Sequence, residues 1–147
     1  MKLTPIRWLF SISALVVLGF LLIQLIPFGK DHTNPPVMFQ QEWDSQRTEQ
    51  LVRGACYDCH SNETNWPWYS NVAPASWLVN FDVSRGRSAL NLSELSPEQA
   101  SFYVNLMVDQ IENNKMPPFQ YNVIHSEGRF SSAEKQELVN GLTATFK

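Results

Sequence analysis

Residues 54–69 read GACYDCHSNETNWPWY and contain both cysteines of the chain, Cys56 and Cys59. Two residues separate them, and His60 follows the second cysteine directly. Residues three positions apart lie on the same side of a helical turn. The stretch therefore predicts one site to which two sulfur atoms and one imidazole contribute, and the rest of the chain is interpreted around it.

Three kinds of site are compatible with this stretch. A structural zinc site needs four ligands, commonly cysteine and histidine, but the chain has only His32 and His125 besides His60. A redox-active disulfide of the thioredoxin type belongs to a βαβ unit, which nothing in this sequence resembles. The third possibility is covalent attachment of c-type haem, which the Cys-X-X-Cys-His pattern signals directly.

The sequence favours haem over the other two. Each thiol of Cys56 and Cys59 adds to one vinyl group of the porphyrin, and the histidine next in line becomes an axial ligand of the iron. We therefore expect one covalently attached haem c, with His60 on one face of the iron. Thioether bonds also withdraw both thiols from disulfide formation in an oxidising compartment.

The second axial ligand is expected to be Met116. It lies in Asn-Lys-Met-Pro-Pro-Phe, where two prolines restrict the backbone of the following loop. His125, nine residues further on, is the alternative distal ligand, and it would give a lower reduction potential than methionine. Met107 falls on an apolar helical stripe, where filling the core is the simpler interpretation. His32 and Met38 precede the predicted haem domain and are not favoured.

Aromatic and basic residues near the motif are candidates for further contacts with haem. Trp66, Trp68 and Tyr69 are predicted to wall the porphyrin, although packing in an ordinary core explains them equally well. Arg85 and Arg87 can pair with the haem propionates, because guanidinium matches carboxylate geometry. A solvated loop is the competing interpretation for this arginine pair.

The N-terminal region differs from the rest of the chain. Residues 8–26 carry no charged side chain, and as a helix they span about 28 Å, close to the thickness of a bilayer core. Lys2 and Arg7 precede them and favour a cytoplasmic N-terminus. A cleaved signal peptide is the alternative, but no small-x-small cleavage site follows. We expect a single-pass anchor at residues 1–28 in a bacterial inner membrane, with the C-terminal domain in the periplasm.

The remainder is predicted to be a linker at residues 29–43 and a haem-binding domain at residues 44–147. The linker is rich in proline, and alternating patterns typical of strands are scarce in the domain. A helix is expected from about Asp44 to Ala55, with Asp44 or Ser45 as its cap. The pattern indicates a small all-α fold, similar to cytochrome c, that wraps around one covalent haem.

Three further helices are expected in this domain. Ser96-Pro97-Glu98-Gln99 and Ser131-Ser132-Ala133-Glu134 are capping boxes that start two of them. A short helix is expected around residues 77–83. A core of this size is marginal by itself, so that a large cofactor is expected to complete it.

Charge excludes one class of partner. Residues 31–147 carry 14 acidic and 8 basic side chains, a net charge of −6. Binding to nucleic acid requires basic patches, so we expect none. The negative charge favours a basic docking partner.

Residues 48–142 resemble the haem-binding domain family of small, bacterial, membrane-anchored monohaem c-type cytochromes. The resemblance is carried by the stretches ACYDCHSNETNWPWYS, VAPASWLV, VSRGRSALNLSE, KMPPFQY, IHSEGRF and SSAEKQELVNGL. It implies that Cys56 and Cys59 attach the haem, that His60 is an axial ligand, and that Met116 is the ligand on the opposite face.

The expected function is transport of single electrons, not enzymatic catalysis. No nucleophile elbow, phosphate loop or paired carboxylates occur in the sequence. Redox proteins or subunits of a respiratory complex are the expected partners, either for a free carrier or for a fixed subunit. One alternative is a haem peroxidase or gas sensor with a displaceable distal methionine. Another is a structural haem subunit of a membrane assembly.

Overall fold

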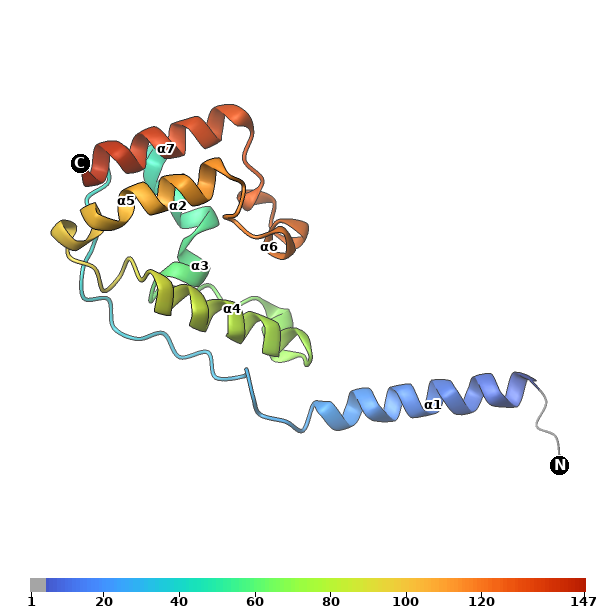
Figure 1. The fold of residues 1–147 in the computed structure, drawn as a ribbon. Coiled ribbons are helices and arrows are strands. Elements are labelled where there is room, and N and C mark those ends of the chain that lie inside the picture. Colours follow the sequence, from blue (N-terminus) through green and yellow to red (C-terminus); the bar gives the residue numbers. More distant parts are fainter. Residues whose placement is uncertain (1–4) are drawn as a thin grey trace. The chain divides into compact units, whose positions relative to one another are not determined.

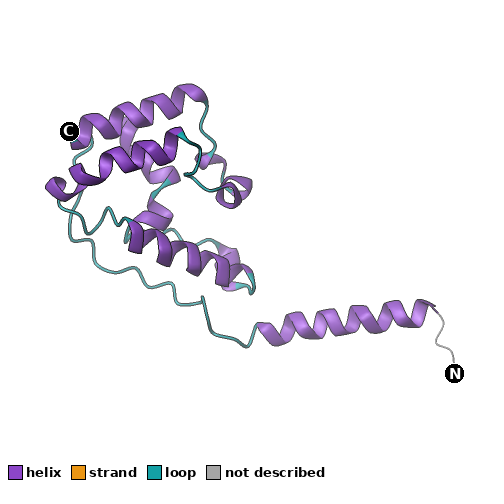
Figure 2. Cartoon of the chain, viewed as in Figure 1, coloured by secondary structure: helices purple, strands orange, loops and turns teal. Residues whose placement is uncertain are grey.

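The computed structural model describes residues 5–147, and Figures 1 and 2 show helices joined by turns and irregular segments, with no strand among these residues. This confirms the predicted all-α class. The helices are α1 Pro5–Ile23, α2 Gln46–Ala55, α3 Tyr57–His60, α4 Ala75–Ala89, α5 Pro97–Glu112, α6 Phe119–Ile124 and α7 Ser132–Phe146, with two 3₁₀-helices, η1 Trp68–Asn71 and η2 Ser126–Gly128.

Serine residues cap three of the helices where the sequence predicts helix starts. The hydroxyl of Ser45 accepts a hydrogen bond from a backbone N–H of the first turn of α2. Ser96 with Gln99, and Ser131 with Glu134, form complete capping boxes at α5 and α7. Each cap satisfies N–H groups that have no partner within the helix. The predicted helix around residues 77–83 is longer, Ala75–Ala89, and α6 was not predicted.

The chain divides into two compact units. The first contains the residues up to Thr33 and Trp66–Asp82, and the second contains Asn34–Asn65 and Val83–Lys147. Helix α4 begins in the first unit and ends in the second. The predicted domain limits at residues 28/29 and 43/44 stay predictions.

The core of the second unit forms where α2 and α5 pack on α7. Gly141 of α7 allows the close approach of α2, since a Cβ atom at this position would overlap the side chain of Thr48. The buried apolar side chains of this core are Leu51, Val52, Tyr57, Leu92, Ala100, Val104, Ile111, Leu138, Val139, Leu142 and Phe146.

Helix α1 is long and apolar enough to cross a membrane. Its window Ile6–Ile23 has a mean hydropathy of 2.3, and none of it is buried within the protein. A signal sequence near the N-terminus has the same length and composition.

The segment predicted as a linker is extended, but its second half is fixed to the second unit. The N–H groups of Met38 and Phe39 both donate to the carbonyl oxygen of Ser93, at 2.9 and 3.0 Å. The buried side chain of Gln41 donates to the carbonyl oxygens of Leu92 and Leu95 at 2.9 and 2.8 Å. Residues 34–41 are therefore part of the folded unit, not a loose tether.

Candidate functional site

The Cys-Tyr-Asp-Cys-His stretch forms a tight helical turn at the end of α2. The N–H of Cys56 donates to Val52 in the last turn of α2, at 2.9 Å. The carbonyl oxygen of Cys56 then accepts from the N–H groups of Cys59 and His60, at 3.2 and 2.8 Å. The five residues thus keep the helical spacing that the sequence predicts for them.

Two main-chain groups hold His60 in place. Its Nδ1 lies 3.0 Å from the carbonyl oxygen of Leu90, and its own carbonyl oxygen accepts from the N–H of Leu92 at 2.8 Å. A carbonyl oxygen only accepts, so Nδ1 carries the proton and Nε2 keeps its lone pair. Burial lowers the pKa of His60, which keeps the ring neutral. A neutral, oriented imidazole with Nε2 unprotonated is ready to bind a metal ion.

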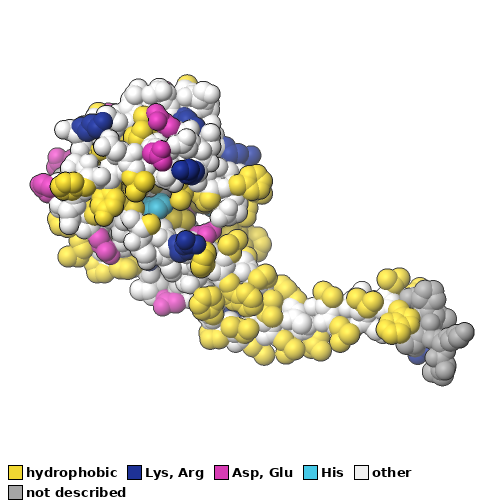
Figure 3. Space-filling view, viewed as in Figure 1, with side chains coloured by type: hydrophobic (Ala, Val, Ile, Leu, Met, Phe, Trp, Pro, Cys, Tyr) yellow, Lys and Arg dark blue, Asp and Glu magenta, His cyan; other side chains and the backbone are white. Residues whose placement is uncertain are grey.

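An apolar pocket of about 220 Å³ lies beside this imidazole. It is lined by Val52, Cys56, His60, Ala89, Leu90, Leu92, Tyr103, Leu106, Met107, Gln110, Ile111, Met116 and Leu142. The pocket reaches the surface, because Leu106, Met116 and Tyr103 are 55%, 39% and 37% exposed. Figure 3 shows hydrophobic side chains gathered around a hollow in which an imidazole is visible.

Such a pocket is expected to hold an apolar group. A closed, empty cavity of this volume costs on the order of 5 kcal/mol, at about 24 cal/mol per Å³. That is comparable to the whole stability of many small domains. An open pocket instead leaves the same side chains in contact with water, so in either case an apolar ligand stabilises the fold.

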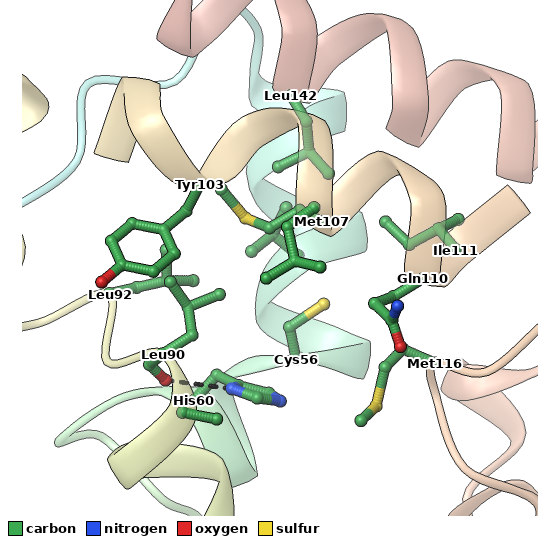
Figure 4. A pocket seen from close by; sticks show the side chains of 13 residues that line it. Cys56, His60, Leu90, Leu92, Tyr103, Met107, Gln110, Ile111, Met116 and Leu142 are labelled. Atoms are coloured by element: carbon green, nitrogen blue, oxygen red, sulfur yellow. Dashed lines mark hydrogen bonds between the residues drawn. The ribbon is translucent and has the colours of Figure 1, made fainter. Parts of the chain in front are cut away.

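Met116 enters the pocket from the loop that follows α5. Its backbone N–H donates to the carbonyl oxygen of Gln110 at 3.1 Å, which ties the loop to the end of the helix. Figure 4 shows the His60 ring pointing across the pocket toward the side on which Met116 lies, with Cys56 pointing into the space above them. The geometry thus brings together an imidazole and a thiol from the cysteine-bearing turn and a thioether from the loop after α5.

The other candidates for the distal ligand lie differently. Met107 also lines the pocket, but it extends from α5 beside Tyr103 and Leu142 (Figure 4). His125 is not among the lining residues; its ring stacks on Tyr121 with centroids 4.1 Å apart, and its Nδ1 lies 3.1 Å from a carboxylate oxygen of Glu127. The arrangement favours Met116, and the ligand assignment stays a prediction.

The cysteines are arranged unequally. Cys56 lines the pocket and burial raises the pKa of its thiol to about 12, which disfavours the thiolate. Cys59 does not line the pocket, and its backbone lies against Gly86 of α4. Within residues 5–147 no group of three or more His, Cys, Asp or Glu side chains is placed to hold a metal ion. The raised pKa of Cys56 and the position of Cys59 outside the pocket do not favour the zinc site.

Arg87, one of the two arginines predicted to pair with the haem propionates, has other hydrogen-bond partners. Arg87 donates from Nε to the carbonyl oxygen of Ser61 at 2.9 Å, and from Nη2 to Asn34 and Thr64, both at 2.8 Å. It thereby fixes the loop that follows the haem motif. Arg85 is exposed on α4. The roles of both arginines toward propionates stay predictions.

The aromatic residues predicted to wall the porphyrin belong to the first unit. Trp66 stacks on His32 with centroids 4.6 Å apart, and Trp68 meets Tyr69 edge to face at 5.8 Å. The side chain of Trp68 is 78% exposed. Their proposed contact with haem stays a prediction.

The structure also reveals supporting residues that the sequence analysis did not assign. The hydroxyl of Tyr121 lies 3.1 Å from the carbonyl oxygen of Gly54 and 3.1 Å from a carboxylate oxygen of Asp58. Asp58, inside the motif, also accepts from the N–H of Asn65 at 3.0 Å. Tyr121 therefore joins the segment after Met116 to the cysteine-bearing turn. In the sequence, the one indication of this contact was Asp58, the acidic residue between the two cysteines.

Replacement of Gly86 with alanine is expected to disturb the haem motif. A Cβ at Gly86 would overlap the carbonyl group of Cys59, and it would lie 2.9 Å from the Cβ of Cys59. Overpacking of this kind costs about 1–3 kcal/mol, more than alanine gains in helix propensity. We expect a lower free energy of unfolding in denaturant titrations and less haem per polypeptide by absorbance.

Gly54→Ala is the matched control for this prediction. A Cβ at Gly54 would meet the Cβ of Glu127 at 3.5 Å, an ordinary contact. The substitution is expected to leave haem content unchanged and to stabilise α2 by up to about 1 kcal/mol. Equal behaviour of the two variants would contradict the close packing of α4 on the motif.

The residues present fit haem. Cys56 and His60 lie at one wall of an apolar pocket with the Nε2 lone pair available, and Met116 lies on another. An all-α unit with this combination of groups defines a haem-binding protein. The chain belongs to the haem-binding domain family, whose defining sequence pattern matches residues 18–144.

One curated relative is also similar. The chain is 27% identical, over 98 residues, to the cytochrome c peroxidase Ccp of Escherichia coli (strain K12). The match covers 60% of this chain and 20% of that protein, so the chain spans about a fifth of the length of its relative. No solved structure matches the chain.

Proposed function

We propose that this protein is a membrane-anchored monohaem c-type cytochrome that carries single electrons on the periplasmic side of a bacterial inner membrane. One observation carries the proposal: His60, held by the Leu90 carbonyl oxygen, and Met116 lie on different walls of the apolar pocket that Cys56 also lines. Cys56 and Cys59 hold the cofactor covalently, and His60 and Met116 are its two axial ligands.

The pocket residues determine what the site can do. Haem, when bound, supplies one-electron chemistry. His60 is fixed as a neutral ligand, and Met116 occupies the position that a substrate would need. With both axial positions taken by the chain, electron transfer is favoured over catalysis on a substrate. Methionine as the second ligand raises the reduction potential.

The anchor and the charges support the proposed location. Lys2 and Arg7 precede the uncharged residues 8–26, which favours a cytoplasmic N-terminus and a domain on the other side of the membrane. An anchor keeps the domain near membrane-bound redox partners and raises their effective concentration. Redox proteins or subunits of a respiratory complex are the proposed partners, and the net charge of −6 favours a basic contact surface on them.

A peroxidase is the second candidate, because the similar protein from Escherichia coli is named as a cytochrome c peroxidase. In this case Met116 would leave the pocket and open a position for peroxide. Its 39% exposure and its place in a loop are compatible with such a movement.

Spectra of the full-length, haem-loaded protein in detergent separate the two candidates. We expect the spectrum of the reduced protein to be unchanged by carbon monoxide, because Met116 blocks access. We also expect peroxide turnover no faster than that of free haem. Carbon monoxide binding together with rapid peroxide turnover would contradict the proposed electron carrier and support the peroxidase.

A further inference from the structure

We propose that residues 66–81 of the first unit lie in the headgroup layer of the membrane that α1 crosses. This inference rests on the membrane anchor of the proposed function, but not on the haem. It identifies a lipid surface as the partner of a segment in which Trp66, Trp68 and Tyr69 are predicted from the sequence to wall the porphyrin.

The composition of this segment suits a membrane surface. Residues 66–81 contain three tryptophans, one tyrosine and one phenylalanine, and no charged side chain. Trp68, Leu78 and Phe81 are 78%, 50% and 51% exposed. Tryptophan and tyrosine are enriched at both membrane–water interfaces, where their rings have one apolar and one polar side.

Hydrogen bonds fix the segment to the end of α1. Gln24 follows the last residue of the helix; its amide nitrogen donates to the carbonyl oxygen of Ala73, and its amide oxygen accepts from the N–H of Ala73, both at 2.9 Å. Gly29, at φ 76°, packs so closely on Ser76 that a Cβ would overlap the Ser76 carbonyl group. The joint between anchor and segment is thus built from the Gln24 side-chain amide paired with the main chain of Ala73, and from the close approach of Gly29 to Ser76.

A second set of contacts continues this attachment. His32 stacks on Trp66, and its Nε2 lies 3.1 Å from the carbonyl oxygen of Ser70. The ammonium group of Lys30 donates to the carbonyl oxygen of Gln24 at 2.6 Å. The chain from residue 24 to residue 32 therefore follows the segment closely instead of leading away from it.

Short lengths of chain keep the exposed side chains close to the end of the anchor. The polar layer on each side of a bilayer is about 5–8 Å thick, half the difference between its total and hydrocarbon thickness. Leu78 lies three residues into α4, about 4.5 Å along the helix axis from its start. Trp68 precedes Ala73 by five residues that include the compact helix η1, so about 10 Å separates them along the chain.

The apolar surface is continuous between the anchor and the segment. Leu25 and Phe28, which follow α1, are 79% and 59% exposed. Figure 3 shows hydrophobic side chains along α1 that continue over its C-terminal end. Because α1 is in lipid under the proposed function, lipid is the partner nearest to this surface, which favours it over a second protein.

Photolabelling of the full-length, haem-loaded protein tests the proposal. The protein is reconstituted into phosphatidylcholine vesicles containing a lipid with a diazirine in its headgroup, and labelled residues are mapped by mass spectrometry. We expect labels at Trp68, Leu78 or Phe81 as well as at the ends of α1. Phe102, 83% exposed on α5, is the internal reference for an exposed apolar side chain and is expected to carry less label.

The outcomes separate this inference from the membrane anchor. Labels in α1 with none in residues 66–81 overturn the inference, whether water or another protein covers the segment, and leave the anchor intact. No label in α1 overturns the anchor itself. Equal labelling of Phe102 and residues 66–81 also overturns the inference, because labelling would then follow exposure alone.

A pair of variants sharpens the test. Leu78→Ser with Phe81→Ser is expected to reduce labelling of the segment, whereas Phe102→Ser is expected to leave it unchanged. All three side chains are at least half exposed, so that the haem spectrum is expected to stay that of the wild type. If the double variant does not fold, the labelling map of the wild type still decides the matter.

Discussion

Replacement of both Cys56 and Cys59 with alanine is expected to yield a polypeptide from which acid acetone removes all haem. The reason is that each thioether forms when one thiol adds across one vinyl group, so no covalent bond remains without the sulfur atoms. The measurement is the mass of the denatured chain together with haem staining after electrophoresis. The wild type is expected to carry the added mass of one haem.

Single variants provide the controls. Cys56→Ala and Cys59→Ala each leave one thiol, so we expect each to keep some covalent haem. Cys59 lies against Gly86 and does not line the pocket, whereas Cys56 does. Retention of the haem mass by the double variant would contradict attachment through these cysteines. A wild type without added mass would contradict c-type attachment altogether.

Met116→Leu is expected to convert the protein into one that binds carbon monoxide in the reduced state. Leucine has nearly the volume of methionine but no sulfur, and such exchanges usually cost less than about 1.5 kcal/mol. Loss of the thioether ligand is also expected to lower the reduction potential. Absorbance with and without carbon monoxide, and a redox titration, are the measurements.

Met107→Leu is the matched control, since Met107 lines the same pocket. It is expected to leave the potential and the spectrum of the wild type unchanged. His125→Asn tests the alternative ligand, and we expect it to affect neither, because His125 contacts Tyr121 and Glu127. A wild-type spectrum in Met116→Leu with a changed spectrum in either control would reassign the ligand.

Local signals in the sequence explain why much of the fold was predictable. Ser45, Ser96 and Ser131 act on N–H groups within three residues of themselves, so short motifs are sufficient to place the starts of α2, α5 and α7. The haem motif is equally local. Its interpretation as a haem-attachment site depends on five residues that are adjacent in the chain.

Other features depend on contacts between distant residues and were not predictable. The length of α4 is one example, because residues 84–89 have little apolar periodicity and Gly86 is explained only by the backbone of Cys59. The hydrogen bond from His60 to Leu90 is another, since its acceptor is a main-chain atom that the sequence does not distinguish. The docking of residues 34–41 also depends on main-chain acceptors, such as Ser93.

The use of main-chain atoms around His60 has an evolutionary consequence. Any amino acid at position 90 provides the carbonyl oxygen that orients the imidazole, and any except proline at position 92 provides the second hydrogen bond. Homologues can therefore diverge at both positions, within the limits of apolar packing, and still present the same ring. Such a site tolerates sequence drift, and distant descendants can retain the cofactor when little else of the sequence is shared.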